Sequence, residues 1–176
     1  MKSLLCCFLG ILILNFFSCN NASSNLEFVG SLPKTISESS GIEVTEKSNT
    51  IWTLEDSGND SKLYALDQLG NLKHTLEITD QTNTDWEDLT SDQDGNLYIG
   101  DFGNNDNDRK DLSIYKINAA DLSNANIKSS LKITFFYPEQ TAFPPKKSKR
   151  FFDVESFFIR NNTSRSNSLE VFICIV

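Results

Sequence analysis

The sequence has little of what histidine and cysteine chemistry requires. Its 176 residues include one histidine, His74, which excludes zinc sites built from several histidines and argues against a histidine relay. Of the four cysteines, Cys6 and Cys7 lie in an N-terminal apolar segment, and only Cys19 and Cys174 follow it. No CxxC metal site can therefore be built, whereas carboxylate and calcium chemistry remain open.

Positive charge is also scarce, with 16 Lys and Arg against 24 Asp and Glu. The net charge of −8 argues against binding nucleic acid through its phosphates, and it suits cations, cationic ligands or neutral ligands. Apolar residues make up 39% of the chain and include 13 Phe, 4 Tyr and 2 Trp. This composition is enough for the core of one soluble domain and excludes a disordered tail.

The N-terminal apolar run, Leu4 to Phe17, is too short to cross a bilayer comfortably. Because it follows Lys2, it predicts a secretory signal peptide over residues 1–18. The sequence Phe16-Phe-Ser-Cys19 resembles the cleavage box of bacterial lipoproteins, although its two phenylalanines depart from that pattern. The resemblance implies an exported protein anchored to the bacterial cell envelope through lipid on Cys19, and the alternative is an ordinary signal peptide.

Residues 19–25 are then the lipidated cysteine and a polar tether, and residues 26–176 form the folded domain. Short two-residue alternations of apolar and polar side chains run through this domain and predict strands rather than helices. Two sets of four strands and the start of a third are expected at 41–45, 50–54, 62–66 and 72–78, at 88–91, 96–100, 112–117 and 131–137, and at 154–160 and 169–176. The segment 121–129 lacks a clear alternation and is predicted to be a loop.

The two complete sets repeat at an interval of about 45 residues. Asp56-Ser-Gly-Asn59 recurs as Asp101-Phe-Gly-Asn104, and Trp52 lies 46 residues before Tyr98. A four-stranded unit of this length is the size of one β-propeller blade, so we predict an all-β propeller of four-stranded antiparallel blades. About three blades fit the chain and at least four are needed to close a ring, which predicts an incomplete propeller. A sandwich with two similar hairpins is the alternative.

The stretch from Asp94 to Asp101 places Asp-Gly where a tight turn needs positive φ. It resembles the repeat hairpins of soluble propellers of the NHL and gluconolactonase-like kind. Other segments make residues 30–160 similar to a family of bacterial lipoproteins with a phytase-like or esterase-like propeller: 38–42, 56–59, 85–88, 100–105 and 152–155. The resemblance implies a propeller fold, an exported location and a poorly defined activity.

The order of strands predicts where carboxylates meet. In an antiparallel pair, the residue that opens the first strand lies beside the residue that closes the second. Glu38 should therefore lie beside Asp56, and Glu87 and Asp88 beside Asp101, with Asp153 or Glu155 at the same rim. First strands line the channel of a propeller, so these groups should converge at its mouth.

Carboxylates about 5 Å apart repel by roughly 3 kcal/mol per pair at an effective dielectric near 20, so a cluster of them favours a bound cation. Oxygen-only ligands suit Ca²⁺, and the predicted metal ligands are Glu38, Asp56, Glu87, Asp88 and Asp101. Amide oxygens are available from Asn59, Asn104 and Asn105. The alternative for each Asp-x-Gly-Asn segment is a plain turn whose Asp accepts backbone N–H groups.

Trp86, between two acidic residues, is the better candidate for a ligand-stacking platform, and a place in the core is its alternative. In a calcium-dependent hydrolase of phosphate or other esters, Glu87 would be the general base. Ser39 is a poor nucleophile because Gly-x-Ser-x-Gly is absent and His74 lies in another strand. The basic run 146–150 suits phosphate or anionic lipid headgroups, or is a solvated loop.

The C-terminal stretch 169–176 is an apolar strand without a closing partner, which predicts a sticky edge. Either the chain is truncated or another chain completes the sheet. The preferred interpretation is a lipid-anchored propeller segment with a binding or scaffold role that holds a divalent cation, and a small-molecule ligand with it, at an acidic rim. A calcium-dependent phosphoesterase or esterase is the second interpretation, and a nonfunctional remnant of a longer gene is the third.

Overall fold

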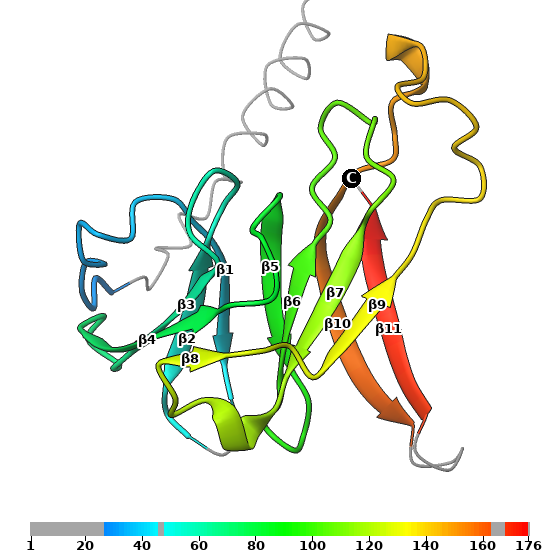
Figure 1. Ribbon diagram of the computed structural model, residues 1–176. Helices are drawn as coiled ribbons and strands as arrows, with labels where there is room; N and C mark the ends of the chain where they lie inside the picture. The colour runs from blue at the N-terminus through cyan, green and yellow to red at the C-terminus, as the bar shows by residue number, and fades with distance from the viewer. Residues whose placement is uncertain (1–26, 46–47, 163–167, 176) are drawn as a thin grey trace, which may run out of the picture.

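The computed structural model describes residues 27–45, 48–162 and 168–175, and this part of the chain is all-β (Figure 1). Besides its strands it contains two single-turn 3₁₀ helices, η1 (Ala119–Asp121) and η2 (Lys147–Lys149). None of the described helices has the length and apolar character that crossing a membrane requires. The predicted signal peptide, the lipidation site Cys19 and the polar tether lie outside the described residues.

Three antiparallel sheets follow one another along the chain and lie side by side (Figure 1). The first is a meander of β1 (Ser39–Val44), β2 (Ile51–Glu55), β3 (Lys62–Leu66) and β4 (Leu72–Ile78). The second contains β5 (Trp86–Ser91), β6 (Leu97–Asp101), β7 (Ser113–Ile117) and β9 (Leu131–Thr134). The third is the pair β10 (Val154–Asn162) and β11 (Ser168–Ile175).

The strands predicted from the alternation are present in order, with most bounds within two residues of the prediction and two larger differences. The strand expected over 131–137 ends at Thr134. The predicted loop 121–129 contains a short strand, β8 (Asn126–Ile127), which pairs in parallel with the outer edge of β4. Pairing at a sheet edge uses backbone groups, so it does not require the alternating side chains on which the prediction depended.

Two hairpin loops share the sequence Asp-Gln-x-Gly-Asn, Asp67–Asn71 between β3 and β4 and Asp92–Asn96 between β5 and β6. In each, the backbone N–H and side-chain amide of the Asn donate to the Asp carboxylate. The glycines have φ of +81° and +84°, which glycine adopts without strain. The predicted turn at Asp94-Gly95 is confirmed, and its earlier copy was not recognised from the sequence.

Among the opening strands of the three sheets, β5 contacts both β1 and β10. Gly41 of β1 lies so close to β5 that a Cβ atom there would be 2.8 Å from the backbone nitrogen of Leu89. On the other side of β5, the carboxylate of Asp88 accepts the N–H of Phe157 on β10 at 2.9 Å. None of the sheets closes on itself within the described residues.

Two clusters of buried side chains join neighbouring sheets. The cluster between the first and second sheets includes Trp52, Leu54, Leu63, Leu76, Trp86, Leu89, Leu97 and Ile99. The cluster between the second and third sheets includes Tyr98, Phe102, Leu112, Ile114, Val154 and Phe157. Burial of these side chains is the main favourable contribution to folding, and it sets the three opening strands next to one another.

Candidate functional site

All three sheets have a β-bulge near the start of the opening strand. The register shifts lie between Ser39 and Ile42, between Trp86 and Asp88, and between Val154 and Ser156. In the second and third sheets the extra residue is a glutamate, Glu87 or Glu155, and an aspartate stands two positions before it. Bulges re-aim side chains and are frequent beside functional sites, so this repeated Asp-x-Glu motif marks where the site should be sought.

Three carboxylates converge at the bulge of β5. One oxygen each from Asp56, Asp85 and Glu87 lies within 4.8 Å of the other two, and all three side chains are partly buried. Asp56 comes directly after β2, and the other two flank Trp86 at the start of β5. The site is therefore built where the second strand of one sheet ends beside the opening strand of the next.

Gly103 lies directly against two of these carboxylates. A Cβ atom at this position would be within 2.2 Å of Glu87 Oε1 and 2.4 Å of Asp85 Oδ2. Any larger residue would displace the ends of these two side chains, so glycine at this position leaves the room in which the carboxylates converge. The Gly103 N–H also donates to the Asp85 carbonyl at 3.2 Å, which holds the two segments together.

Two further acidic residues, Asp153 and Glu155, act on these carboxylates through their charge. Burial, followed by the charges of Glu155, Asp85, Asp56 and Asp153, raises the pKa of Glu87 to about 8. Burial and neighbouring carboxylates also raise the pKa of Asp85 and that of Glu155 above their ordinary values. We call these five residues the acidic site. Their mutual repulsion is the electrostatic condition under which a cation is attracted.

Of the predicted metal ligands, Asp56 and Glu87 are brought together, and Glu38 lies beside them without joining the three converging carboxylates. The backbone of Asp56 donates to the Glu38 carbonyl at 2.9 Å, as the strand order predicted. The Asn59 amide donates to Glu38 Oε2 at 2.8 Å and to the Asp56 carbonyl at 3.1 Å. Asn59 therefore joins Glu38 to Asp56 at the edge of the acidic site. Glu38 is a neighbour of the candidate ligands and not one of them.

The structure places Asp101 in a different network. Its side chain is 1% exposed and accepts hydrogen bonds from Arg109 at 2.8 Å, from Tyr115 at 3.0 Å and from the Asp85 N–H at 3.1 Å. Both carboxylate oxygens are thus occupied by protein donors. Asp101 orients the backbone of Asp85, and its charge is compensated by Arg109 rather than left for a metal ion.

Asp88 also points away from the three converging carboxylates. Its carboxylate accepts the N–H of Leu89 at 2.8 Å and that of Phe157 at 2.9 Å, so it joins β5 to β10. Burial raises its pKa above the ordinary value. Asp88 therefore has the contacts of a structural residue between the opening strands.

The sequence suggested that Asp56 corresponds to Asp101, but the strand pairing shifts this internal repeat by one residue. Strand pairing matches Glu55 of the first sheet with Asp101 of the second, because each lies opposite the first residue of its opening strand. Tyr64 donates to Glu55 at 2.8 Å as Tyr115 does to Asp101 at 3.0 Å. The 46-residue spacing of Trp52 and Tyr98 already contained this register, and by it Glu55, not Asp56, corresponds to Asp101.

Trp86 and Asn104, the other two predicted ligand-binding residues, are buried. Trp86 is 0% exposed in the core between the first two sheets, so its ring offers no face to a ligand, and its Nε1 has no hydrogen-bond partner among the described residues. The Asn104 amide donates to the Phe152 carbonyl at 2.7 Å and its oxygen accepts the Arg109 N–H at 2.9 Å. The backbone of Asn104 also donates to Asp153 at 2.7 Å, so Asn104 positions a residue of the acidic site.

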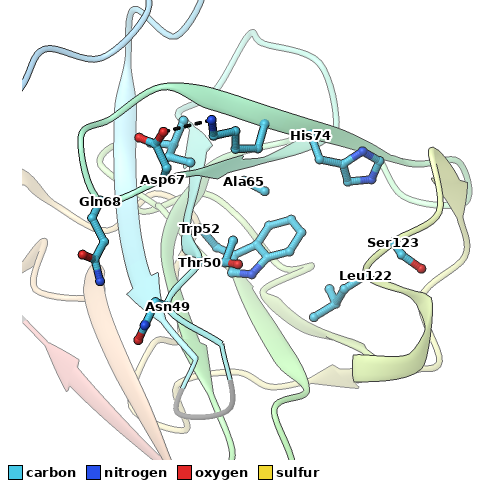
Figure 2. Close-up of a pocket in the computed structure, with 11 residues that line it drawn as sticks. Asn49, Thr50, Trp52, Ala65, Asp67, Gln68, His74, Leu122 and Ser123 are labelled. Atoms are coloured by element: carbon cyan, nitrogen blue, oxygen red, sulfur yellow. Dashed lines mark ion pairs between the residues drawn. The ribbon is translucent and has the colours of Figure 1, made fainter.

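One cavity lies apart from the acidic site. It has a volume of about 630 Å³, and Figure 2 shows Trp52, His74 and Leu122 around it. His74 Nε2 lies 2.9 Å from the Asn124 carbonyl, and Lys73 pairs with Asp67 at 3.0 Å. The lining thus has no cluster of carboxylates and no nucleophile paired with the histidine, and we locate the functional site at the acidic residues.

Asp85 was not among the metal ligands predicted from the sequence. Asp153 or Glu155 was expected at the same rim, and in the structure both act on Glu87 through their charge. The recurrence of Asp-x-Glu at 85–87 and 153–155 is the sequence signal from which these residues could have been predicted.

Comparison of the chain with models of protein families, with curated proteins and with solved structures finds no match.

Proposed function

We propose that this protein binds a divalent cation, Ca²⁺ by preference, at the acidic site, in a binding or scaffold role. The observation that carries the proposal is the convergence of Asp56, Asp85 and Glu87 within 4.8 Å against the bare backbone of Gly103. A ligand set of carboxylate oxygens suits hard cations, and Ca²⁺ tolerates an irregular arrangement better than Mg²⁺ does. Asp153 and Glu155 add negative charge around the same point.

The incomplete propeller belongs to the same proposal. Its support is the succession of meandering sheets, the contacts among their opening strands and the bulge repeated in each. Among the described strands β11 pairs only with β10, and a partner chain at β11 remains a prediction. An exported, lipid-anchored location at the bacterial cell envelope is supported by the sequence of residues 2–19.

Calorimetric titration with Ca²⁺ tests the metal proposal. We expect saturable binding by the wild type and at least about tenfold weaker binding by Glu87→Gln and by Gly103→Ala, since the first removes a ligand charge and the second displaces two carboxylates. Glu77→Gln is the matched control because Glu77 is an exposed carboxylate on β4, and it should change the affinity less than twofold.

Absence of binding heat in the wild type contradicts the proposal. So does an equal loss of affinity in Glu77→Gln, because net charge alone would then explain the attraction. Circular dichroism of each variant separates loss of binding from loss of the fold.

A calcium-dependent hydrolase of phosphate or carboxylic esters is the second candidate, and it is favoured by one observation. In the site without a cation, the pKa of Glu87 is about 8, so this carboxyl can give and take a proton near neutral pH. When bound, the cation would activate water, while Glu87 would hold or accept the proton. A panel of such esters should be turned over by the wild type and at least about a hundredfold more slowly by Glu87→Gln; equal rates remove Glu87 from the chemistry.

A further inference from the structure

The connection between β9 and β10 exposes three phenylalanines. Phe136, Phe143 and Phe151 are 73%, 38% and 63% exposed. Single exposed apolar residues are common, but three aromatic side chains within one connection form a surface that water solvates poorly. In Figure 1 this connection projects beyond the ends of the strands, with η2 near its tip.

The same connection is basic in an otherwise acidic chain. Residues 135–153 include four cationic side chains and two carboxylates, Glu139 and Asp153, so the connection is positive, against a net charge of −8 for the whole sequence. Lys146, Lys147 and Lys149 are exposed, and none of them forms an ion pair with another described residue. Lys110, from the neighbouring loop between β6 and β7, lies with its Nζ 4.8 Å from the centre of the Phe143 ring. Lys110, Phe136 and Phe143 line one pocket, so a cation and aromatic rings meet on this side of the connection.

The base of the connection is held in place. Asn107 is 2% exposed with φ of +55°; its side-chain oxygen accepts the Phe152 N–H at 2.9 Å, and its carbonyl accepts the Gln140 amide at 2.7 Å. The Tyr137 and Phe152 rings lie 5.3 Å apart beneath it. The exposed phenylalanines thus project from a connection whose two ends are fixed by hydrogen bonds.

We propose that residues 136–151, with Lys110, dock on the surface of a membrane that contains anionic lipids. Phenylalanine side chains enter the boundary between headgroups and acyl chains, and lysines beside them meet phosphate groups. The surface charge of this connection is opposite to that of an anionic bilayer, although the net charge of the chain has the same sign. This contact is additional to the proposed lipid on Cys19 and independent of the acidic site.

Vesicle sedimentation tests the docking surface, in the full chain carrying Cys19→Ser so that no lipid is attached there. We expect binding to phosphatidylcholine vesicles that contain one quarter phosphatidylglycerol, weakened by high salt. Combined Lys146→Gln, Lys147→Gln and Lys149→Gln should weaken this binding at least tenfold, with little effect on pure phosphatidylcholine. Phe136→Ser with Phe151→Ser should weaken binding to both kinds of vesicle.

The matched controls are Lys34→Gln with Lys128→Gln, two exposed lysines elsewhere, and Leu69→Ser, a residue that is 62% exposed. These should bind vesicles as the parent chain does. Unchanged binding of the triple lysine variant, or equal loss in the controls, overturns the proposal. Preference for soluble polyglutamate over vesicles also overturns it, since the surface would then recognise an acidic peptide.

Discussion

At the scale of single residues, Glu87 and Asp101 have carboxylates of equal formal charge in different environments, and these environments give them different roles. Asp101 accepts three hydrogen bonds from protein donors and pairs with Arg109, so its charge is compensated within the fold. Glu87 faces Asp56, Asp85 and the two acidic residues at the start of β10, and its pKa is raised. Removing the partner of a buried cation such as Arg109 destabilises proteins, whereas removing a repelled carboxylate relieves strain.

The raised pKa of Glu87 predicts a pH-dependent stability. Between its unfolded value near 4.5 and its folded value of about 8, the folded protein holds a proton that the unfolded chain has released, so stability falls as pH rises through this window. Glu87→Gln removes this contribution. In calcium-free urea unfolding, we expect the stability of the variant relative to the wild type to increase by about 2 kcal/mol from pH 5 to pH 9, after allowance for solvent screening of a half-buried group.

The control is Glu77→Gln, whose exposed carboxylate should leave the pH dependence of the wild type unchanged. If the unfolding free energies of wild type and Glu87→Gln run parallel over this range, Glu87 titrates normally and the acidic site exerts less repulsion than its geometry indicates.

At the scale of elements, the two Asp-Gln-x-Gly-Asn hairpins provide a matched pair. Asp92 and Asp67 make the same bonds to their loops, but Asp92 is 7% exposed and also accepts the hydroxyl of the buried Tyr98 at 2.9 Å. Asp67 is partly exposed and accepts no such hydroxyl; each aspartate also pairs with a lysine, Asp67 with Lys73 at 3.0 Å and Asp92 with Lys116 at 3.9 Å. The same turn therefore stabilises only its own loop in the first sheet, whereas in the second sheet it also contacts the core.

Asp92→Ala should lower the free energy of unfolding by about 3 kcal/mol, and Asp67→Ala should lower it by clearly less. Both lose the hydrogen bonds of the turn, but only Asp92→Ala leaves a buried hydroxyl without an acceptor. Urea unfolding of the two variants measures the difference. Equal losses would mean that the Tyr98 hydroxyl contributes nothing to stability.

At the scale of the whole molecule, the acidic site joins elements from different sheets, since Asp56 follows β2, Asp85 precedes β5 and Asp153 precedes β10. A cation bound there would connect the ends of three sheets that the hydrophobic clusters hold elsewhere. Binding would therefore stabilise the arrangement of the sheets, not one loop.

Calcium at about a hundred times its dissociation constant should raise the free energy of unfolding by about 2.7 kcal/mol, because it binds the folded state alone. Thermal unfolding with calcium and with a chelator measures the effect. The gain should be lost in Asp85→Asn and kept in Glu77→Gln. If the melting temperature of the wild type does not change with calcium, a calcium site shared by the three sheets is contradicted.

Local patterns in the sequence determined much of the fold. Alternation of apolar residues placed the strands of the two complete sets, and Asp94-Gly95 determined a turn, because these features depend on side chains only a few positions apart. The strand order also brought Glu38 beside Asp56, since hairpin pairing is local. The all-β class followed from these elements.

Only the tertiary structure decided which carboxylates meet. Asp101 and Asp88 look like ligands in the sequence, yet Arg109 and Tyr115 surround the first and Phe157 of the third sheet holds the second. Their partners come from separate elements, and the bulges that turn Glu87 and Glu155 are set by strand register. The charge state and contacts of a carboxylate depend on groups within a few ångströms, and that neighbourhood exists only once the sheets have packed.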